Sequence, residues 1–309
     1  MNNVSAISMF FLSGLNEARN YRSTLFFLSF LCYSIIILVN VCVVLTIILN
    51  NELHDPMYIL LCAFCMNSIY GTAGFYPKFL SDLLSPVHVI SYSGCLLQAQ
   101  VLYSFACSDL SILALMAYDR YLAICRPLEY HSVMSKQRVI TLVCLAWLIP
   151  FFIIAVSTLL ASRLKLCSPY LNRLICLNWS IVMLACFPAE TIPNSIIGNI
   201  TILIYGLHGV VIGWSYLFLI KTCVGSIENR RKFMQTCVPH LISLFTFLVT
   251  IFFDVIYIRF ETKNLPPTLK HFVSIEFLIL PPLMNPLIYG FKLTQIRKKI
   301  MSVVTMKMK

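Results

Sequence analysis

Charged residues are scarce in this sequence. Only 11% of its 309 residues are Asp, Glu, Lys or Arg, whereas charged residues make up roughly a quarter of an ordinary soluble domain. Hydrophobic residues account for 59% of the chain. This composition excludes an ordinary soluble globular protein and predicts an integral membrane protein.

Long polar segments are also missing, and seven apolar stretches follow one another. A helix needs about 20 mostly apolar residues to cross the hydrocarbon core of a bilayer. The stretches that reach this length are 24–49, 57–80, 95–125, 139–160, 195–220, 234–258 and 271–291. The sequence therefore predicts an all-α membrane protein, a seven-transmembrane helix bundle that occupies residues 1–309 as one domain. No cleavable signal peptide is evident, so we expect the first stretch to stay in the membrane as an anchor.

Lys and Arg are distributed unevenly among the connections. They are more frequent after the third, fifth and seventh stretches than after the second, fourth and sixth, and the positive-inside rule places the richer side in the cytoplasm. Residues 1–23 are then an extracellular N-terminus, in agreement with a glycosylation sequon at Asn3. Residues 292–309 form a cytoplasmic tail that begins with a short basic amphipathic helix. A basic rim that faces anionic membrane lipid explains the net charge of +11 without a nucleic-acid partner.

An acid, an arginine and an aromatic residue stand where the third stretch should leave the membrane, within the segment Met-Ala-Tyr-Asp-Arg-Tyr-Leu-Ala-Ile-Cys at 116–125. An arginine at this depth can be held by the adjacent carboxylate, so Asp119 and Arg120 can form a local lock that another protein opens. The segment resembles the MAYDRYVAIC signature of vertebrate odorant receptors, a branch of the rhodopsin-like G-protein-coupled receptors.

Further motifs extend the resemblance from Asn40 to about Lys292. Leu-His-Asp-Pro-Met-Tyr at 53–58 is similar to the family's L-H-x-P-M-Y loop, and Pro-Pro-Leu-Met-Asn-Pro-Leu-Ile-Tyr at 281–289 to P-M-L-N-P-x-I-Y. Residues 71–80 look more like fish-type receptors. Pro286 frees a backbone carbonyl that Asn285 or water can satisfy. The resemblance implies these switch residues for G-protein coupling: Asp119, Arg120, Tyr121, Tyr216, Asn285, Pro286 and Tyr289.

The same resemblance implies function and location. The protein would bind a small-molecule odorant, activate a heterotrimeric G protein of the stimulatory, olfactory type, and have no enzymatic activity. Its place would be the plasma membrane, in the cilia of olfactory neurons. The identity of the odorant does not follow from the sequence.

Four of the thirteen cysteines fall in segments assigned to the outside. They are Cys95, Cys167, Cys176 and Cys186, and four thiols allow three pairings that residue spacing alone does not distinguish. The resemblance implies the pairs Cys95–Cys176 and Cys167–Cys186. The other nine cysteines show no spacing typical of a metal site, so we interpret them as packing residues. A second sequon, at Asn178, lies close to Cys176.

The second stretch lacks the aspartate that most rhodopsin-like receptors carry, whereas the third contains an acid at Asp109. An acid inside a membrane helix is costly and indicates a functional polar core. Candidate partners are Asn67, Ser68 and Asn285, which with Asp109 would hold an allosteric sodium ion or water. The alternative is a protonated Asp109 that is simply hydrogen-bonded inside the bundle. No other cofactor or metal is expected.

The ligand should bind in the outer half of the bundle, because the switch motifs occupy the inner half. Asp254 and Glu276 would suit a polar or cationic ligand, although either acid could instead pair with a basic residue at the rim. The candidate ligand-binding residues are Leu102, Tyr103, Ala106, Cys107, Asn199, Thr201, Phe253, Asp254, Tyr257 and Glu276.

Three other classes compete with an odorant receptor. A non-olfactory rhodopsin-like receptor would share the switch motifs. A transporter or channel would show inverted halves or helices broken by Gly and Pro at matching positions, and these are absent from the sequence. An intramembrane enzyme would need converging catalytic groups, and neither Asp109 nor His208 has an evident partner of that kind.

Overall fold

A computed structural model of the chain describes residues 7–15 and 20–223. Beyond these it describes 241, 242, 244, 245, 248, 249, 276, 278–292, 296, 297 and 299, with the backbone alone for 288–292. The sixth predicted stretch, 234–258, lies almost entirely outside the described residues. Asn3, Phe253, Asp254 and Tyr257 also lie outside them.

Five helices in the described part are long and apolar enough to cross a membrane. They are α1 (Arg22–Leu49), α2 (Pro56–Leu84), α3 (Tyr92–Cys125), α5 (Lys136–Ser162) and α7 (Ile192–Cys223). The first five predicted stretches are therefore helices, and most run a few residues further than the apolar stretch. At 1.5 Å per residue even the 27-residue α5 is about 40 Å long, enough to cross a hydrocarbon core of about 30 Å. A shorter helix, α10 (Leu280–Lys292), corresponds to the end of the seventh stretch.

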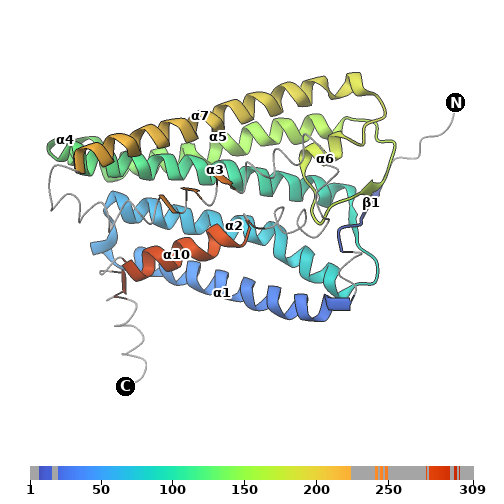
Figure 1. Cartoon of the computed structure of the whole chain (residues 1–309), viewed down its shortest axis with the longest axis horizontal. Coiled ribbons are helices and arrows are strands. Elements are labelled where there is room, and N and C mark those ends of the chain that lie inside the picture. Colours follow the sequence, from blue (N-terminus) through green and yellow to red (C-terminus); the bar gives the residue numbers. More distant parts are fainter. Residues whose placement is uncertain are drawn as a thin grey trace.

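The long helices lie side by side along the long axis of the molecule, and α3 runs through the middle (Figure 1). It packs against α2, α5 and α7, while α10 packs against α1 and α2. Large apolar side chains on the outer helices point away from the bundle, such as Phe27 with 69% and Trp214 with 70% of its surface exposed. Such side chains are compatible with the hydrocarbon of a bilayer, in which a helix pairs most of its own backbone polar groups.

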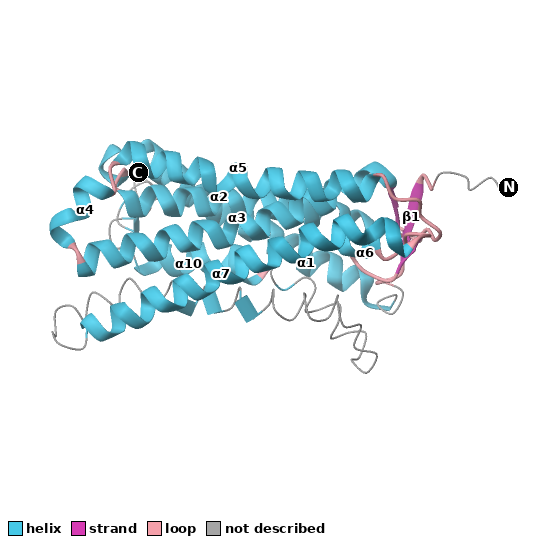
Figure 2. Ribbon diagram, turned by 90° about the horizontal axis from the view of Figure 1, so that it is seen from above, coloured by secondary structure: helices cyan, strands magenta, loops and turns pink. Residues whose placement is uncertain are grey.

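A small sheet closes one end of the bundle. β1 (Met9–Leu12) pairs antiparallel with β2 (Val89–Ser91) and parallel with β3 (Tyr170–Leu171), so the strand order is β2-β1-β3. Figure 2 shows the sheet at the opposite end from α4 (Pro127–Val133), which directly follows α3. We call these the sheet end and the Arg120 end. The bundle is helical as predicted, and the N-terminal segment adds the central strand of this small sheet.

Two disulfides hold the connection between α5 and α7 at the sheet end. Cys95 at the start of α3 is bonded to Cys176, and Cys167 to Cys186. Both pairs are the ones that the family resemblance implies. The backbone N–H of Cys176 also donates to Oε1 of Gln98 at 2.9 Å, which fixes the connection against α3 a second time.

A partly buried cationic contact joins the start of α1 to the connection between α2 and β2. Arg22 Nη1 donates to the carbonyl of Ser85 at 3.1 Å, and Nη2 lies 2.8 Å from Nε2 of His88. The ion pair Lys78–Asp82 lies on the adjacent turns of α2. Burial lowers the pKa of His88, and the charge of Arg22 lowers it further. His88 therefore accepts a hydrogen bond from Arg22 as a neutral imidazole.

Candidate functional site

The lock at the Arg120 end involves three residues rather than two. Arg120 Nε donates to Oδ2 of Asp119 at 2.9 Å, and Nη2 contacts the same oxygen. The hydroxyl of Tyr130, on α4, donates to the other oxygen, Oδ1, at 2.8 Å. Asp119 has no exposed surface, so these neighbours replace water around its carboxylate.

Local sequence explains how Tyr130 reaches this carboxylate. Arg126 leaves helical geometry with φ −135° and ψ 55°, and Pro127 then begins α4 at its first turn. The chain reverses, and Tyr130 is carried back to α3. Burial raises the pKa of the Tyr130 phenol, and the adjacent Asp119 carboxylate raises it further, so the phenol remains a donor. The sequence motif did not indicate Tyr130, because its role depends on this reversal.

Two other predicted switch residues lie on the neighbouring surfaces of α3 and α7. The ring of Tyr121 meets Phe218 of α7 edge to face, with centroids 6.3 Å apart. Tyr216, also on α7, is 2% exposed and belongs to the main hydrophobic core. The side chain of Tyr289 is not among the described ones.

A polar cluster lies in the middle of the bundle. Asn67 Nδ2 donates to Oδ1 of Asp109 at 2.6 Å and to the carbonyl of Phe105 at 3.0 Å, which joins α2 to α3. Ser68 instead donates to Phe64 within its own helix at 3.1 Å. Asp109 Oδ2 and both polar side-chain atoms of Asn285 are buried and have no hydrogen-bond partner among the described residues. Of the three predicted partners, only Asn67 bonds directly to Asp109.

The carbonyl that Pro286 leaves without a backbone donor has a different partner from the expected one. Pro286 has no N–H to offer the carbonyl of Pro282, four residues earlier. Asn40 Nδ2, from α1, donates to that carbonyl at 2.8 Å. Among the described residues Asn40, and not Asn285, therefore donates to the freed carbonyl, because α1 passes close enough for it to do so. This bond attaches α10 to α1 at the bend.

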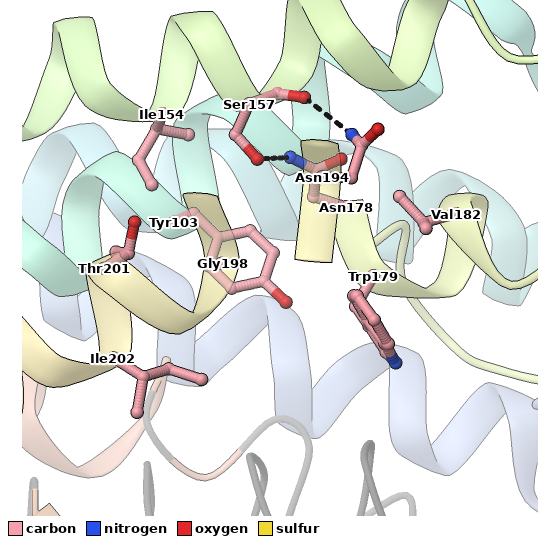
Figure 3. Close-up of a pocket in the computed structure, with 10 residues that line it drawn as sticks. All are labelled: Tyr103, Ile154, Ser157, Asn178, Trp179, Val182, Asn194, Gly198, Thr201 and Ile202. Atoms are coloured by element: carbon pink, nitrogen blue, oxygen red, sulfur yellow. Dashed lines mark hydrogen bonds between the residues drawn. The ribbon is translucent and has the colours of Figure 1, made fainter. Parts of the chain in front are cut away.

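A pocket opens between α3, α5 and α7 toward the sheet end, with an empty volume of about 610 Å³. The short helix α6 (Asn178–Val182) forms one of its walls. Figure 3 shows the lining residues, which are Tyr103, Ile154, Ser157, Asn178, Trp179, Val182, Asn194, Gly198, Thr201 and Ile202.

Hydrogen bonds fix the polar side of the pocket. Asn178 Nδ2 donates to Oγ of Ser157 at 2.7 Å, and Asn194 Nδ2 donates to the Ser157 carbonyl at 3.3 Å. Three segments distant in sequence therefore meet at one serine (Figure 3). Asn178 is only 7% exposed, so its amide nitrogen is occupied in the folded protein rather than presented as a glycosylation site.

The predicted ligand-binding residues separate into two groups. Tyr103 and Thr201 line the pocket. Leu102 packs in a separate apolar cluster, Ala106 and Cys107 pack in the main core, and neither Asn199 nor Glu276 is among the lining residues. The sequence identified α3 as a wall of the pocket, but it did not show which face of α3 points into the pocket. The lining residues of α5 and α6 had no recognisable signal apart from the sequon at Asn178.

The comparisons with known proteins agree with this architecture. The family model described as olfactory receptor matches residues 28–307. Olfactory receptor 11H6 of Homo sapiens is 32% identical over 289 residues, which cover 93% of this chain and 86% of the relative. Olfactory receptor 4M1 of Homo sapiens is 33% identical over 98% of this chain and 96% of its own length. Olfactory receptor 6B9 of Mus musculus is 29% identical over 98% and 96% of the two chains.

Long apolar helices, a buried polar cluster and a pocket at one end define a multi-pass membrane receptor. The chain belongs to the olfactory receptor family. It is therefore a non-enzymatic G-protein-coupled receptor for odorants. The finer resemblance to fish-type receptors stays a prediction.

Proposed function

We propose that the odorant binds in the pocket between α3, α5, α6 and α7 and that it is a neutral, mostly apolar molecule with one hydroxyl group. None of the described residues that line it is charged, so beside them an ammonium or carboxylate group would lose its hydration without an opposite charge. Ile154, Val182 and Ile202 provide apolar surface. This arrangement favours an alcohol over the cationic ligand that Asp254 and Glu276 suggested.

The single observation that carries this assignment is the acceptor on Asn178. Its amide nitrogen is occupied by Ser157, while Oδ1 is buried and has no partner among the described residues. A ligand hydroxyl that donates to Oδ1 would satisfy this atom. A site with a buried polar group discriminates strongly against analogues that leave that group unpaired.

A matched ligand series tests the class. An alcohol, a ketone, an amine and a carboxylic acid on the same carbon skeleton would be applied to cells that express the receptor, with cyclic AMP as the readout. We expect the alcohol to be the most potent agonist of each series. A receptor that responds best to the amine or the acid would contradict the proposal.

A pair of neighbouring substitutions on α7 tests the location. Ile202 lines the pocket, whereas Leu203 is 64% exposed on the outer surface of the bundle. We expect Ile202→Phe to fill the pocket and reduce agonist potency at least tenfold, while Leu203→Phe leaves it unchanged at equal surface expression. Equal effects of the two substitutions would show that the ligand does not bind in this pocket.

We further propose that the Arg120 end faces the cytoplasm and engages a G protein of the stimulatory, olfactory type. The N-terminus would then be extracellular and glycosylated at Asn3, in the ciliary membrane of an olfactory neuron. The buried charge pair of Arg120 and Asp119 supports a switch at this end. We expect Arg120→Ala to abolish agonist-stimulated cyclic AMP while surface expression stays measurable, and normal signalling by that variant would refute the mechanism.

We also propose that a sodium ion binds at the polar cluster around Asp109 and acts as an allosteric ligand. Asp109 Oδ2 and Asn285 Oδ1 are buried oxygen atoms of the kind that hard cations bind, and the Ser68 hydroxyl retains lone pairs. With one carboxylate the site would be weak, because a monovalent ion gains little to set against its dehydration.

Linkage provides the test for sodium. If the ion favours the resting bundle, agonist affinity should fall when sodium replaces a large organic cation at equal ionic strength. We expect Asp109→Asn to abolish this difference. A sodium effect that persists in Asp109→Asn would exclude Asp109 as the ligand, and no effect in either protein would favour the protonated, structural alternative.

A further inference from the structure

A second hollow lies outside the bundle, near the Arg120 end. It has an empty volume of about 660 Å³, and its walls come from α1, α2 and α5. Ile48 of α1, Met66 of α2 and Ile140 of α5 line it and are all more than 40% exposed. Because these are large apolar side chains, the groove opens toward the hydrocarbon of the membrane.

The groove runs along α5 from its first residue toward the middle of the membrane. Lys136, Ile140, Val143 and Trp147 all line it, and their spacing of three or four residues places them on one face of the helix. Eleven residues separate Lys136 from Trp147, a rise of about 16 Å. The groove is therefore long enough to hold a large part of an extended hydrocarbon chain.

Its two ends differ in chemistry. At the Arg120 end, Lys136 Nζ lies 3.3 Å from Nδ1 of His54, in the connection before α2. No ion pair between Lys136 and an acidic side chain is found within the described part of the chain. The other described lining residues carry no charge and are apolar apart from the indole N–H of Trp147. A cation and an imidazole thus stand at the mouth of an apolar groove.

We propose that this groove binds an anionic phospholipid, with the phosphate at Lys136 and His54 and one acyl chain along α5 as far as Trp147. A phosphate adjacent to an ammonium group gains a charge-assisted hydrogen bond. A choline headgroup would bring a second cation to a mouth that already carries Lys136. Under the proposed orientation the mouth lies in the cytoplasmic leaflet, where anionic lipids are concentrated. The inference does not depend on which odorant binds.

Fluorescence of Trp147 can report on the acyl chain. The chain has only three tryptophans, so Trp179→Phe and Trp214→Phe leave Trp147 as the single emitter. The receptor would be reconstituted in phosphatidylcholine bilayers that contain a small fraction of lipid brominated on the acyl chain, as either phosphatidylserine or phosphatidylcholine. We expect brominated phosphatidylserine to quench Trp147 at about one fifth of the concentration that brominated phosphatidylcholine requires.

Two substitutions at the start of α5 distinguish lipid binding in the groove from general attraction of anionic lipid to the basic residues of the rim. Lys136 lines the groove, whereas Arg138, which is also exposed, is not among the lining residues. Lys136→Gln should abolish the preference for phosphatidylserine, and Arg138→Gln should retain it. Both changes are at the surface, and an unchanged thermal unfolding transition verifies that each variant is folded. Equal loss in the two variants would assign the preference to the rim as a whole and overturn the specific site.

Competition identifies the occupant. Unlabelled phosphatidylserine should relieve the quenching by brominated phosphatidylserine, while cholesterol at the same mole fraction should not. If cholesterol competes more strongly, the groove is a sterol site and the proposal is wrong. Equal quenching by the two brominated lipids in the unsubstituted background would show bulk lipid contact without selection, and that result would also refute it.

Discussion

Replacing Gly71 by alanine should destabilise the receptor, because α2 and α3 touch at this point without room for a side chain. A Cβ atom at Gly71 would lie 2.3 Å from Cγ and 2.4 Å from Cδ2 of the Phe105 ring. Phe105 has no exposed surface and packs among Phe75 and Leu102, so the ring cannot move away. One of the two helices must shift.

The expected magnitude follows from two opposing effects. Alanine favours a helix over glycine by about 1 kcal/mol. Overpacking a well-filled core typically costs about 1–3 kcal/mol, and a contact as short as this lies toward the upper part of that range. The net loss should be about 1–2 kcal/mol. Since Gly71 is one turn from Asn67, the shift should also strain the 2.6 Å hydrogen bond to Asp109.

Thermal unfolding of the purified receptor in detergent, followed by circular dichroism, measures this effect. Gly213→Ala in α7 is the matched control. Apart from its own helix, nothing in the described part of the chain lies within 4 Å of the position that a Cβ would take there, so only the gain in helix propensity remains. We expect a lower Tm for Gly71→Ala and an unchanged or higher Tm for Gly213→Ala. Adding Phe105→Leu to Gly71→Ala should recover part of the loss, as expected for coupled neighbours. A Gly71→Ala receptor as stable as the wild type would refute the close-contact argument.

Three other predictions concern the ends of the bundle. Cys95→Ser and Cys176→Ser should each reduce surface delivery, and the double variant should be no worse than either, whereas additive losses would argue against the bond. Stability should decrease as pH falls through the ordinary histidine pKa of about 6.5, because the unfolded chain then takes up a proton while His88 beside Arg22 stays neutral. The loss should level off below the lowered pKa of the folded protein, and His88→Gln should weaken this part of the pH dependence of Tm. Tyr130→Phe removes one hydrogen bond to a buried carboxylate and should raise basal cyclic AMP, which assays in transfected cells would detect.

Sequence alone located the five long membrane helices of the described part and the charged motif at the end of α3. A spanning helix must be apolar over about 20 consecutive residues and satisfies its backbone hydrogen bonds within itself, so its signal is local. The contact between Asp119 and Arg120 is local as well, because the two residues are adjacent. The disulfide pairs followed only from the family resemblance, since four cysteines allow three pairings.

Tertiary structure decided the contacts between residues far apart in the chain. The sequence shows that Pro286 leaves a carbonyl unsatisfied, but the packing of α1 against α10 determines that Asn40 satisfies it across 242 residues. The pocket likewise depends on Ser157 and Asn178, which meet because two disulfides fold the connection back over α3 and α5. Apolar periodicity does not fix the rotation of a helix that is covered on most sides by other helices, as for α3. Which side chains line the pocket is therefore a property of how the helices pack, and not of any one segment.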